Sequence, residues 1–379
     1  MNREEYQKKW IEKTSIWDTH IERIKASDLS NDQKQHVIDS FNKIRETFGE
    51  NWLGQIVSDR KHPLLYEILN LAPWTRFKLA DFGDKLVEAK EIKNFYKLKQ
   101  RLMSARDYYA AEAEFEILIM LKRAGLEVEI PHESGKKIPD ILAKIDGKEV
   151  CFEVTTMRDA YEWQAAFKTL NALTFPFFPD FEIEFTGKIH RILSTPRRKE
   201  LIEKLKIAAQ KAKIEKIPVE VSEPGLIDFL FVPKGLHSEI QKWLQLKGFH
   251  GGIQGPPVHV DEVKRIKRAI YEKAKQIPKD KPGVIVVFDS HLTTGLERGT
   301  FAHVVYQVEE DVYEHPNLLG AIIISSLITG EKPSEIIEDE NFFFISKTSY
   351  EILCHNILII RNKYSNFEEL GSILDIFKA

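Results

Sequence analysis

The first 104 residues carry apolar residues three or four positions apart, which is the spacing of amphipathic helices. Pro63 and Pro73 interrupt this pattern, and Ser30 or Asn31 is a suitable N-terminal cap. The pattern predicts helices over residues 4–25, 31–48, 64–71 and 84–106. We therefore expect an N-terminal helical subdomain over residues 1–104, whose tryptophans (Trp10, Trp17 and Trp52) pack in a core and do not stack on bases.

A different period begins at Asp140, where apolar and polar residues alternate on both sides of the dipeptide Asp146-Gly147. Asp-Gly between two alternating runs is a strong signal for a β-hairpin, because a two-residue type I′ turn needs positive φ at both central positions. If these two residues form the turn, Ile145 pairs with Lys148. Counting outward from that pair places Asp140 directly opposite Glu153.

The alternation assigns each hairpin residue to one of two faces, because strand side chains point to opposite sides with period two. One face is apolar and consists of Ile141, Ala143, Ile145, Val150, Phe152 and Val154. The other face carries Asp140 and Glu153, together with Leu142, Lys144, Glu149 and Cys151. Like charges directly opposite each other destabilise a sheet. A divalent cation is the simplest compensation for this pair.

A third carboxylate comes from the segment before the hairpin, where residues 108–124 have a helical pattern that ends at Gly125. Glu114 shares the apolar stripe of this helix, whereas Glu112 and Glu116 are predicted to point more nearly to solvent. A glutamate on a buried stripe is costly unless it is paired or bound to a metal. Glu114 is therefore a candidate site residue.

The segments around the hairpin predict an alternating α/β pattern. A strand is expected at residues 126–130, a helix at 260–277, a fully buried strand at 284–288, a helix at 301–313, and strands at 321–325 and 357–360. These elements would extend the hairpin into a mixed sheet with helices on both faces. The intervening segment predicts strands near 181–185, 218–221 and 226–232 and a helix over 197–213.

Composition adds limits to this picture. The chain has 379 residues, 43% hydrophobic and 30% charged, which is typical of a globular protein of two domains or one large one. It contains no apolar run of membrane-spanning length, and its polar start is not that of a secretory signal, so we expect a cytoplasmic protein without membrane contact. Two cysteines support neither a disulfide framework nor a zinc site.

The net charge is only −3, but basic residues cluster between Lys188 and Lys216, where ten of them face three acidic residues. Such a cluster suits contact with phosphates of nucleic acid, and Arg197, Arg198, Lys199 and Lys204 are the candidates for that contact. A solvated helix face is an equally good interpretation of the same cluster.

Taken together, Glu114 in a helix, Pro139-Asp140 and Glu153-x-Thr155 resemble the PD-(D/E)xK nuclease superfamily over about residues 105–157. The resemblance implies a restriction-endonuclease-like mixed sheet flanked by helices. It also implies a nuclease-like domain over residues 105–379 with an insertion at about 158–258. In that superfamily the corresponding acids hold Mg²⁺, so Asp140, Glu153 and Glu114 would be ligands of Mg²⁺ or Mn²⁺.

Thr155 departs from the family pattern, which has a lysine at this position. A lysine from elsewhere is one solution, and the candidates are Lys136 or Lys137 before the hairpin and Lys273 or Lys275, with Gln276, on the helix at 260–277. Alternatively, the metal alone could activate water, or the site binds without cutting. Asp289 is a further acid, for which helix capping or a turn is the more frequent role.

These observations favour a metal-dependent nuclease that hydrolyses phosphodiester bonds, with DNA expected by family analogy alone. The alternative is a catalytically inactive nuclease-fold module that binds nucleic acid or a protein partner. A third hypothesis is a structural component of a larger assembly, in which the N-terminal helices dock a partner or a second copy of the chain. The sequence contains no GxxxxGK phosphate loop, no GxGxxG, no HExxH and no GxSxG motif.

Overall fold

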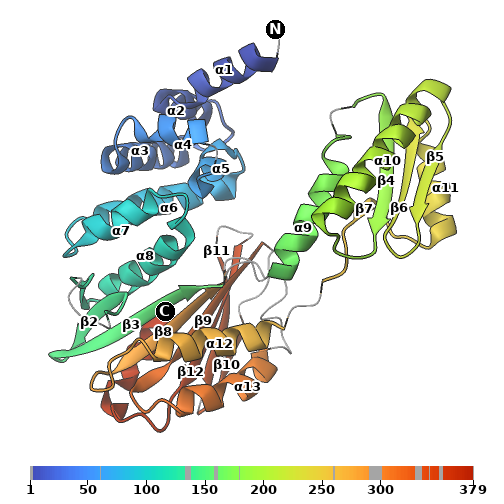
Figure 1. Ribbon diagram of the computed structural model, residues 1–379. Helices are drawn as coiled ribbons and strands as arrows, with labels where there is room; N and C mark the ends of the chain where they lie inside the picture. The colour runs from blue at the N-terminus through green and yellow to red at the C-terminus, as the bar shows by residue number, and fades with distance from the viewer. Residues whose placement is uncertain are drawn as a thin grey trace. The chain divides into compact units, whose positions relative to one another are not determined.

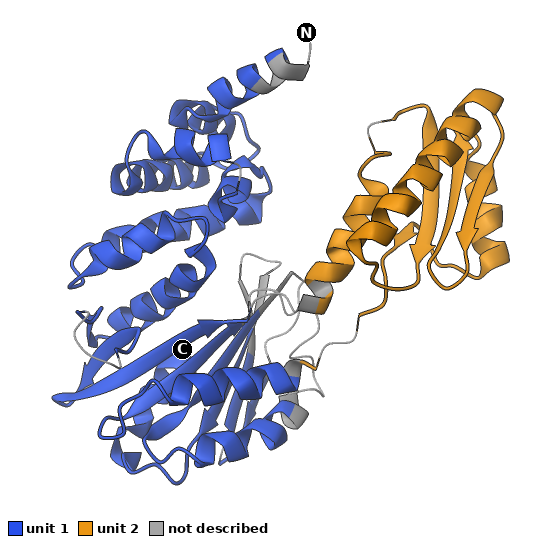
Figure 2. Cartoon of the chain, viewed as in Figure 1, with its two compact units in different colours: residues 1–158, 262–379 blue, residues 159–261 orange. Residues whose placement is uncertain are grey.

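The computed structural model describes residues 3–59, 61–132, 138–157, 161–178, 180–258, 261–289, 301–328, 335–340, 342–349 and 353–378. The chain forms two compact units (Figure 2): unit 1 contains residues 1–158 and 262–379, and unit 2 contains residues 159–261. The insertion expected at about 158–258 falls within the residue range of unit 2 and the residue before it. The N-terminal helices belong to the same unit as the hairpin.

Unit 1 begins with helices α1 (Arg3–Thr14), α2 (Trp17–Lys25), α3 (Asn31–Phe48), α4 (Trp52–Asp59), α5 (Pro63–Leu69), α6 (Pro73–Ala89), α7 (Phe95–Leu102) and α8 (Tyr108–Arg123) (Figure 1). Ser30 caps α3 through a reciprocal pair of hydrogen bonds with Gln33. Pro63 and Pro73 occupy the first turns of α5 and α6, where proline is tolerated. Trp17 and Trp52 stack in the core with ring centroids 6.4 Å apart.

Two of the expected helices were wrong in extent. The helix expected over residues 4–25 is divided between α1 and α2. The helix expected over residues 84–106 is divided between α6 and α7, because the chain turns at residues 90–94 and Asn94 adopts a left-handed conformation with φ 65°. Asn94 Nδ2 donates to the carbonyl of Ile130, 2.7 Å away, so a contact with a distant segment fixes this turn.

The sheet of unit 1 has the strand order β1-β2-β3-β8-β9-β12-β11-β10 among the described residues. Its strands are β1 (Glu127–Glu129), β2 (Ile141–Ile145), β3 (Lys148–Thr156), β8 (Gly283–Asp289), β9 (Leu318–Ile328), β10 (Glu335–Glu338), β11 (Phe342–Ser349) and β12 (Leu353–Arg361). The β3, β8 and β9 strands run parallel, and the remaining neighbours are antiparallel. The expected extension of the hairpin into a mixed sheet is confirmed.

The hairpin forms as its turn residues predict. Asp146 and Gly147 have φ values of 48° and 78°, and Ile145 pairs with Lys148. The last pair of this ladder is Ile141 with Phe152. The next residues outward are Asp140 and Glu153, which therefore occupy facing positions. The residues predicted on the apolar face are buried, apart from the partly buried Ile145 near the turn.

Helices cover both faces of the sheet (Figure 1). The apolar hairpin face packs with α8 and with the C-terminal 3₁₀ helix Glu368–Lys378. The opposite face packs against α12 (Glu262–Ala274) and α13 (Phe301–Tyr313). Cys151 is buried on this second face, and burial raises the pKa of its thiol to about 12.

Helix α8 is buried on more sides than expected, because α6 also packs against it. Glu112 and Glu116 are more exposed than Glu114, as predicted, with side-chain exposures of 16% and 27% against 7%, but neither side chain is free in solvent. Lys78 of α6 lies 3.3 Å from Glu112 Oε1, and Lys85 lies 2.5 Å from Glu116 Oε2. The two glutamates thus join α8 to the N-terminal helices.

Unit 2 consists of α9 (Tyr161–Thr174), β4 (Ile183–Ile189), α10 (Thr195–Glu215), β5 (Val219–Glu223), β6 (Ile227–Pro233), α11 (His237–Lys247) and β7 (Ile253–Gln254). Its strands are ordered β5-β6-β4-β7. Phe229 and Phe231 of β6 pack with α10, whereas Leu230 and Val232 pack with α11, so alternate residues bury the two faces. In the part of the chain that the structure describes, no helix combines the length and apolar character of a membrane span.

Candidate active site

The two hairpin carboxylates share one ammonium group. Lys273 Nζ donates to Asp140 Oδ2, 2.9 Å away, and to Glu153 Oε2, 2.7 Å away. Asp140 Oδ2 also accepts a 2.8 Å hydrogen bond from the backbone N–H of Val154. The repulsion expected between the facing acids is therefore relieved by a lysine that comes from more than a hundred residues further along the chain.

Helix α12 presents this lysine because its apolar side is fixed against the sheet. Ile266, Ile270 and Ala274 are buried in the core between α12, α13 and the strands. Lys273 precedes Ala274, and its side chain is only 17% exposed. Gln276 Oε1 lies 3.4 Å from the same Nζ, so the candidates Lys273 and Gln276 do meet at the hairpin.

Among the described residues, Lys275 is the other lysine candidate. It contacts its own helix, with its Nζ 3.4 Å from Glu272 and 3.6 Å from the ring centroid of Tyr271, whereas Lys273 contacts the hairpin acids. Lys136 and Lys137 lie outside the described residues, as does the side chain of Asp289. Thr155 is partly buried in β3, two residues after Glu153, and pairs in register with Val287.

Glu153 is the most buried acid of the site. Its side chain has no exposed surface, and Oε1 has no hydrogen-bond partner among the described residues. Burial, reinforced by the charge of Asp140, raises the pKa of Glu153 to about 7 despite the ammonium of Lys273. A buried carboxylate oxygen without a protein partner is rare in folded proteins, and this oxygen is available to accept a water molecule or a cation.

Glu114 is buried as predicted, with 5% of its surface exposed. Its two oxygens accept hydrogen bonds of 2.5 and 2.8 Å from Nη1 and Nη2 of Arg101 on α7. Burial raises the pKa of Glu114 to about 7; Arg101 opposes this shift and Asp140 adds to it. Arg101 was not identified from the sequence, because the turn at residues 90–94 that sets its position was not predicted.

The fit of these residues to a metal ion is partial. Among the described residues, no three His, Cys, Asp or Glu side chains converge as a ligand cluster. Mg²⁺ is often bound through only one or two carboxylates plus water and substrate phosphate, and Asp140 with the unpartnered Oε1 of Glu153 fits that requirement. Glu114 does not fit as a direct ligand, because Arg101 engages both of its oxygens.

The basic residues predicted to contact nucleic acid lie in α10 of unit 2, where Glu200 of the same helix and Glu223 of β5 neutralise part of their charge. Arg197 pairs with Glu200 and Glu223, and Lys204 Nζ lies 3.2 Å from Glu200 and 2.5 Å from Glu223. Lys199 is exposed. The net charge of this surface is therefore lower than the count from residue 188 to 216 implied.

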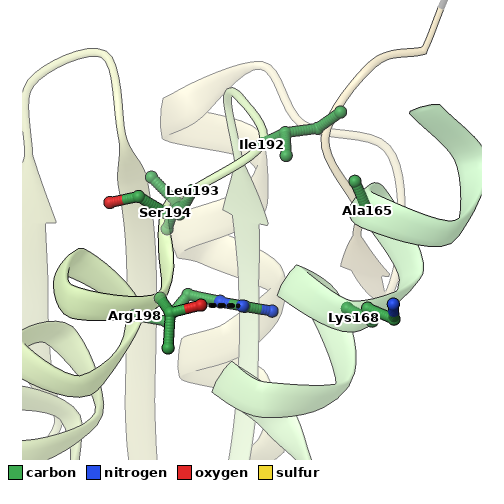
Figure 3. A pocket seen from close by; sticks show the side chains of 7 residues that line it. Ala165, Lys168, Ile192, Leu193, Ser194 and Arg198 are labelled. Atoms are coloured by element: carbon green, nitrogen blue, oxygen red, sulfur yellow. Dashed lines mark hydrogen bonds between the residues drawn. The ribbon is translucent and has the colours of Figure 1, made fainter. Parts of the chain in front are cut away.

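Arg198 has a different setting from these paired residues. It lines a pocket of about 320 Å³ with Lys168 of α9 and with Ser194 (Figure 3). Its Nη2 donates to Thr195 Oγ1 at 2.8 Å. Of the four candidates, Arg198 therefore lines this pocket, and a second basic side chain, Lys168, lines it as well.

The chain matches no protein-family model, no curated protein and no solved structure. The assignment of a function therefore depends on the geometry of the hairpin, α8 and α12.

Proposed function

We propose that the protein is a metal-dependent nuclease of restriction-endonuclease-like fold. The observation that carries this proposal is the group formed by Asp140, Glu153 and Lys273, in which one ammonium bridges two carboxylates while a buried oxygen of Glu153 has no partner. Two acids and one lysine in contact are the chemical set that the PD-(D/E)xK resemblance requires. Here the lysine would come from α12 in place of Thr155.

The arrangement of the surrounding elements supports the same proposal. Helix α8 packs on one face of the hairpin, and the chain returns through α12 on the other face to add β8 parallel to β3. Glu153 and Lys273 therefore lie in regular elements with buried apolar sides, and Asp140, directly before β2, is held by the backbone N–H of Val154. Such rigid support favours a precise catalytic group.

Lys273 would act as a permanent cation in this site. Its own burial lowers the pKa, but the adjacent charges of Asp140 and Glu153 outweigh burial and raise it above the ordinary value for lysine. Because it stays protonated at neutral pH, Lys273 can donate hydrogen bonds to a water molecule or a phosphate oxygen but cannot serve as a base. Bound Mg²⁺ would supply Lewis-acid activation of water and of the scissile phosphate.

The proposal is tested by incubating the protein with plasmid DNA and with RNA in Mg²⁺, Mn²⁺ or EDTA. We expect cleavage that requires the metal and that Asp140→Asn and Glu153→Gln each abolish. Lys281→Met is the matched control, because Lys281 pairs with Glu149 on the same face of the hairpin at 2.6 Å but is more exposed. Cleavage that persists in both acid variants would show that the chemistry lies elsewhere.

A second candidate function is a non-catalytic module that binds nucleic acid. The specific observation in its favour is that Lys273 already balances the two carboxylates without a metal. This alternative predicts that DNA is bound in every metal condition and never cleaved, so the same assay separates the two functions.

A further inference from the structure

The ion pair of Arg101 and Glu114 joins a buried carboxylate to a guanidinium that solvent can reach. The Glu114 side chain is 7% exposed, whereas that of Arg101 is 41% exposed. Two parallel hydrogen bonds hold the guanidinium in one plane. The buried Glu114 therefore orients the guanidinium of Arg101 from the protein interior, and the opposite side of the guanidinium is exposed to solvent.

This pair lies within the electrostatic range of the hairpin carboxylates. Burial lowers the pKa of Arg101, but Glu114 and Asp140 outweigh it and raise the pKa above its ordinary value. Lys273 and Asp140 likewise act on Glu114. Helix α8, which carries Glu114, packs on β2 and β3, so the pair of Arg101 and Glu114 is held beside the hairpin.

A pair at the other end of α8 shows what an ordinary structural ion pair looks like in this protein. Arg123 Nε and Nη2 donate to the two oxygens of Glu88 at 2.9 and 2.6 Å. There both side chains are well exposed, 48% and 35%, so neither charge is expensive to hold. Glu114, in contrast, is buried at a cost that one half-exposed partner repays poorly, which is more typical of a functional site.

The open side of Arg101 suits a phosphate. A guanidinium has five N–H donors in a planar fork, and Glu114 accepts from only two of them. Helix α7 also carries Lys97 one turn earlier and Lys99, and it has no acidic residue. Lys97 and Arg101, four residues apart, share one side of the helix. Glu114 of α8 offsets the charge of Arg101, but Lys97 and Lys99 add positive charge to the same helix.

We propose that Arg101 binds a phosphate of the nucleic-acid strand at the hairpin site, and that Glu114 is a positioning residue that orients Arg101 and not a metal ligand. The inference rests on the proposed function in that it takes nucleic acid as the substrate. It differs from the expectation drawn from the superfamily, in which the helix glutamate holds metal.

Binding of a fluorescent DNA oligonucleotide, followed by anisotropy in Ca²⁺, tests the role of Arg101. We expect Arg101→Gln to weaken binding by about 10- to 100-fold and to reduce the slope of log affinity against log salt by about one. Arg101→Lys should recover part of the affinity, because the charge remains without the planar fork. Arg123→Gln, the matched control, should bind like the parent protein.

The proposal is overturned if Arg101→Gln keeps the affinity and salt slope of the parent protein, or if Arg123→Gln weakens binding equally. Failure of the parent protein to bind DNA would overturn both this inference and the proposed function. Metal-dependent cleavage with unchanged binding by Arg101→Gln would overturn this inference alone. Thermal unfolding of each variant verifies that it is folded.

Mn²⁺ titration without nucleic acid tests the role of Glu114. Glu114→Gln should bind Mn²⁺ as the parent protein does, whereas Glu153→Gln should lose binding. Equal loss in both variants would make Glu114 a metal ligand and contradict its positioning role.

Discussion

Replacing Lys273 by methionine removes a cation that contacts both hairpin carboxylates. The methionine side chain is similar in length but carries no charge, so Asp140 and Glu153 are left facing each other without compensation. Glu153 has no exposed surface, and Asp140 is 22% exposed, so water can screen neither charge well. The substitution should therefore destabilise the fold as well as impair any hydrolysis.

The magnitude follows from how deeply each ion pair is buried. Removing one partner of a buried ion pair costs about 3–5 kcal/mol. The control Lys281→Met breaks a pair whose side chains are 39% and 40% exposed, and such pairs contribute only about 0–1 kcal/mol. A difference of about 3 kcal/mol between the two variants is therefore expected near pH 8.

The difference should shrink as the pH falls. Without Lys273, the pKa of Glu153 rises further above its ordinary value, so the folded variant takes up a proton that the unfolded chain does not bind. Stability lost to the ionised carboxyl is then recovered by about 1.4 kcal/mol per pH unit below the folded pKa. Millimolar Mg²⁺ should also recover stability in Lys273→Met near pH 8, because the cation replaces the missing positive charge.

Urea unfolding followed by circular dichroism gives these free energies directly. Both variants would be measured near pH 8 and near pH 6, with and without Mg²⁺. If Lys273→Met is no less stable than Lys281→Met near pH 8, the carboxylates do not depend on Lys273 and our description of the site is wrong.

Two further predictions concern the N-terminal helices. Burial lowers the pKa of His20 and His62 below 6.5, so their contribution to stability is complete above that pH and decreases as the pH falls. The variant His62→Asn keeps a capping side chain at α5 and should therefore lose less stability than the parent protein between about pH 7.5 and 5.5 in urea unfolding. An equal loss of stability in both proteins would contradict this prediction. Gly83→Ala would place Cβ 2.6 Å from the carbonyl oxygen of Ser40 and should lower the free energy of unfolding by about 1–3 kcal/mol. In the control Gly54→Ala, the nearest atom would lie 3.7 Å from Cβ, so the variant should be neutral or stabilising. Equal melting temperatures for the two variants would refute the close packing of α3 and α6.

The sequence was sufficient to predict the hairpin and its register, because local chemistry determines both. Asp146 and Gly147 are suited to positive φ, and alternation then assigns every neighbour to a face. The facing positions of Asp140 and Glu153 followed from these two facts. Burial of Glu114 followed from the apolar stripe of α8 in the same way.

The partners of these acids depended on long-range contacts that no local pattern encodes. Arg101 reaches Glu114 because α6 and α7 are separated by a turn that Asn94 fixes on Ile130, and the sequence contains no glycine or proline there to signal a break. Lys273 was one of several candidates, and only the packing of α12 distinguishes it from Lys275.

The basic cluster at residues 188–216 shows a related limit. A count of charges along residues 188–216 does not include acids that other strands and loops place next to α10. Examples are Glu223 beside Lys204 and Asp180 beside Lys213. The count therefore overstated the positive charge of α10. The same limit applies to α7, where Glu114 of α8 pairs with Arg101.

The most direct test of the central claim is the binding of Mn²⁺ to the protein alone, measured by the electron paramagnetic resonance signal of free Mn²⁺. We predict that the parent protein and Lys281→Met remove Mn²⁺ from solution, and that Asp140→Asn and Glu153→Gln do not. Equal binding by all four proteins, or no binding by the parent protein, would contradict a metal centre built on the two hairpin carboxylates.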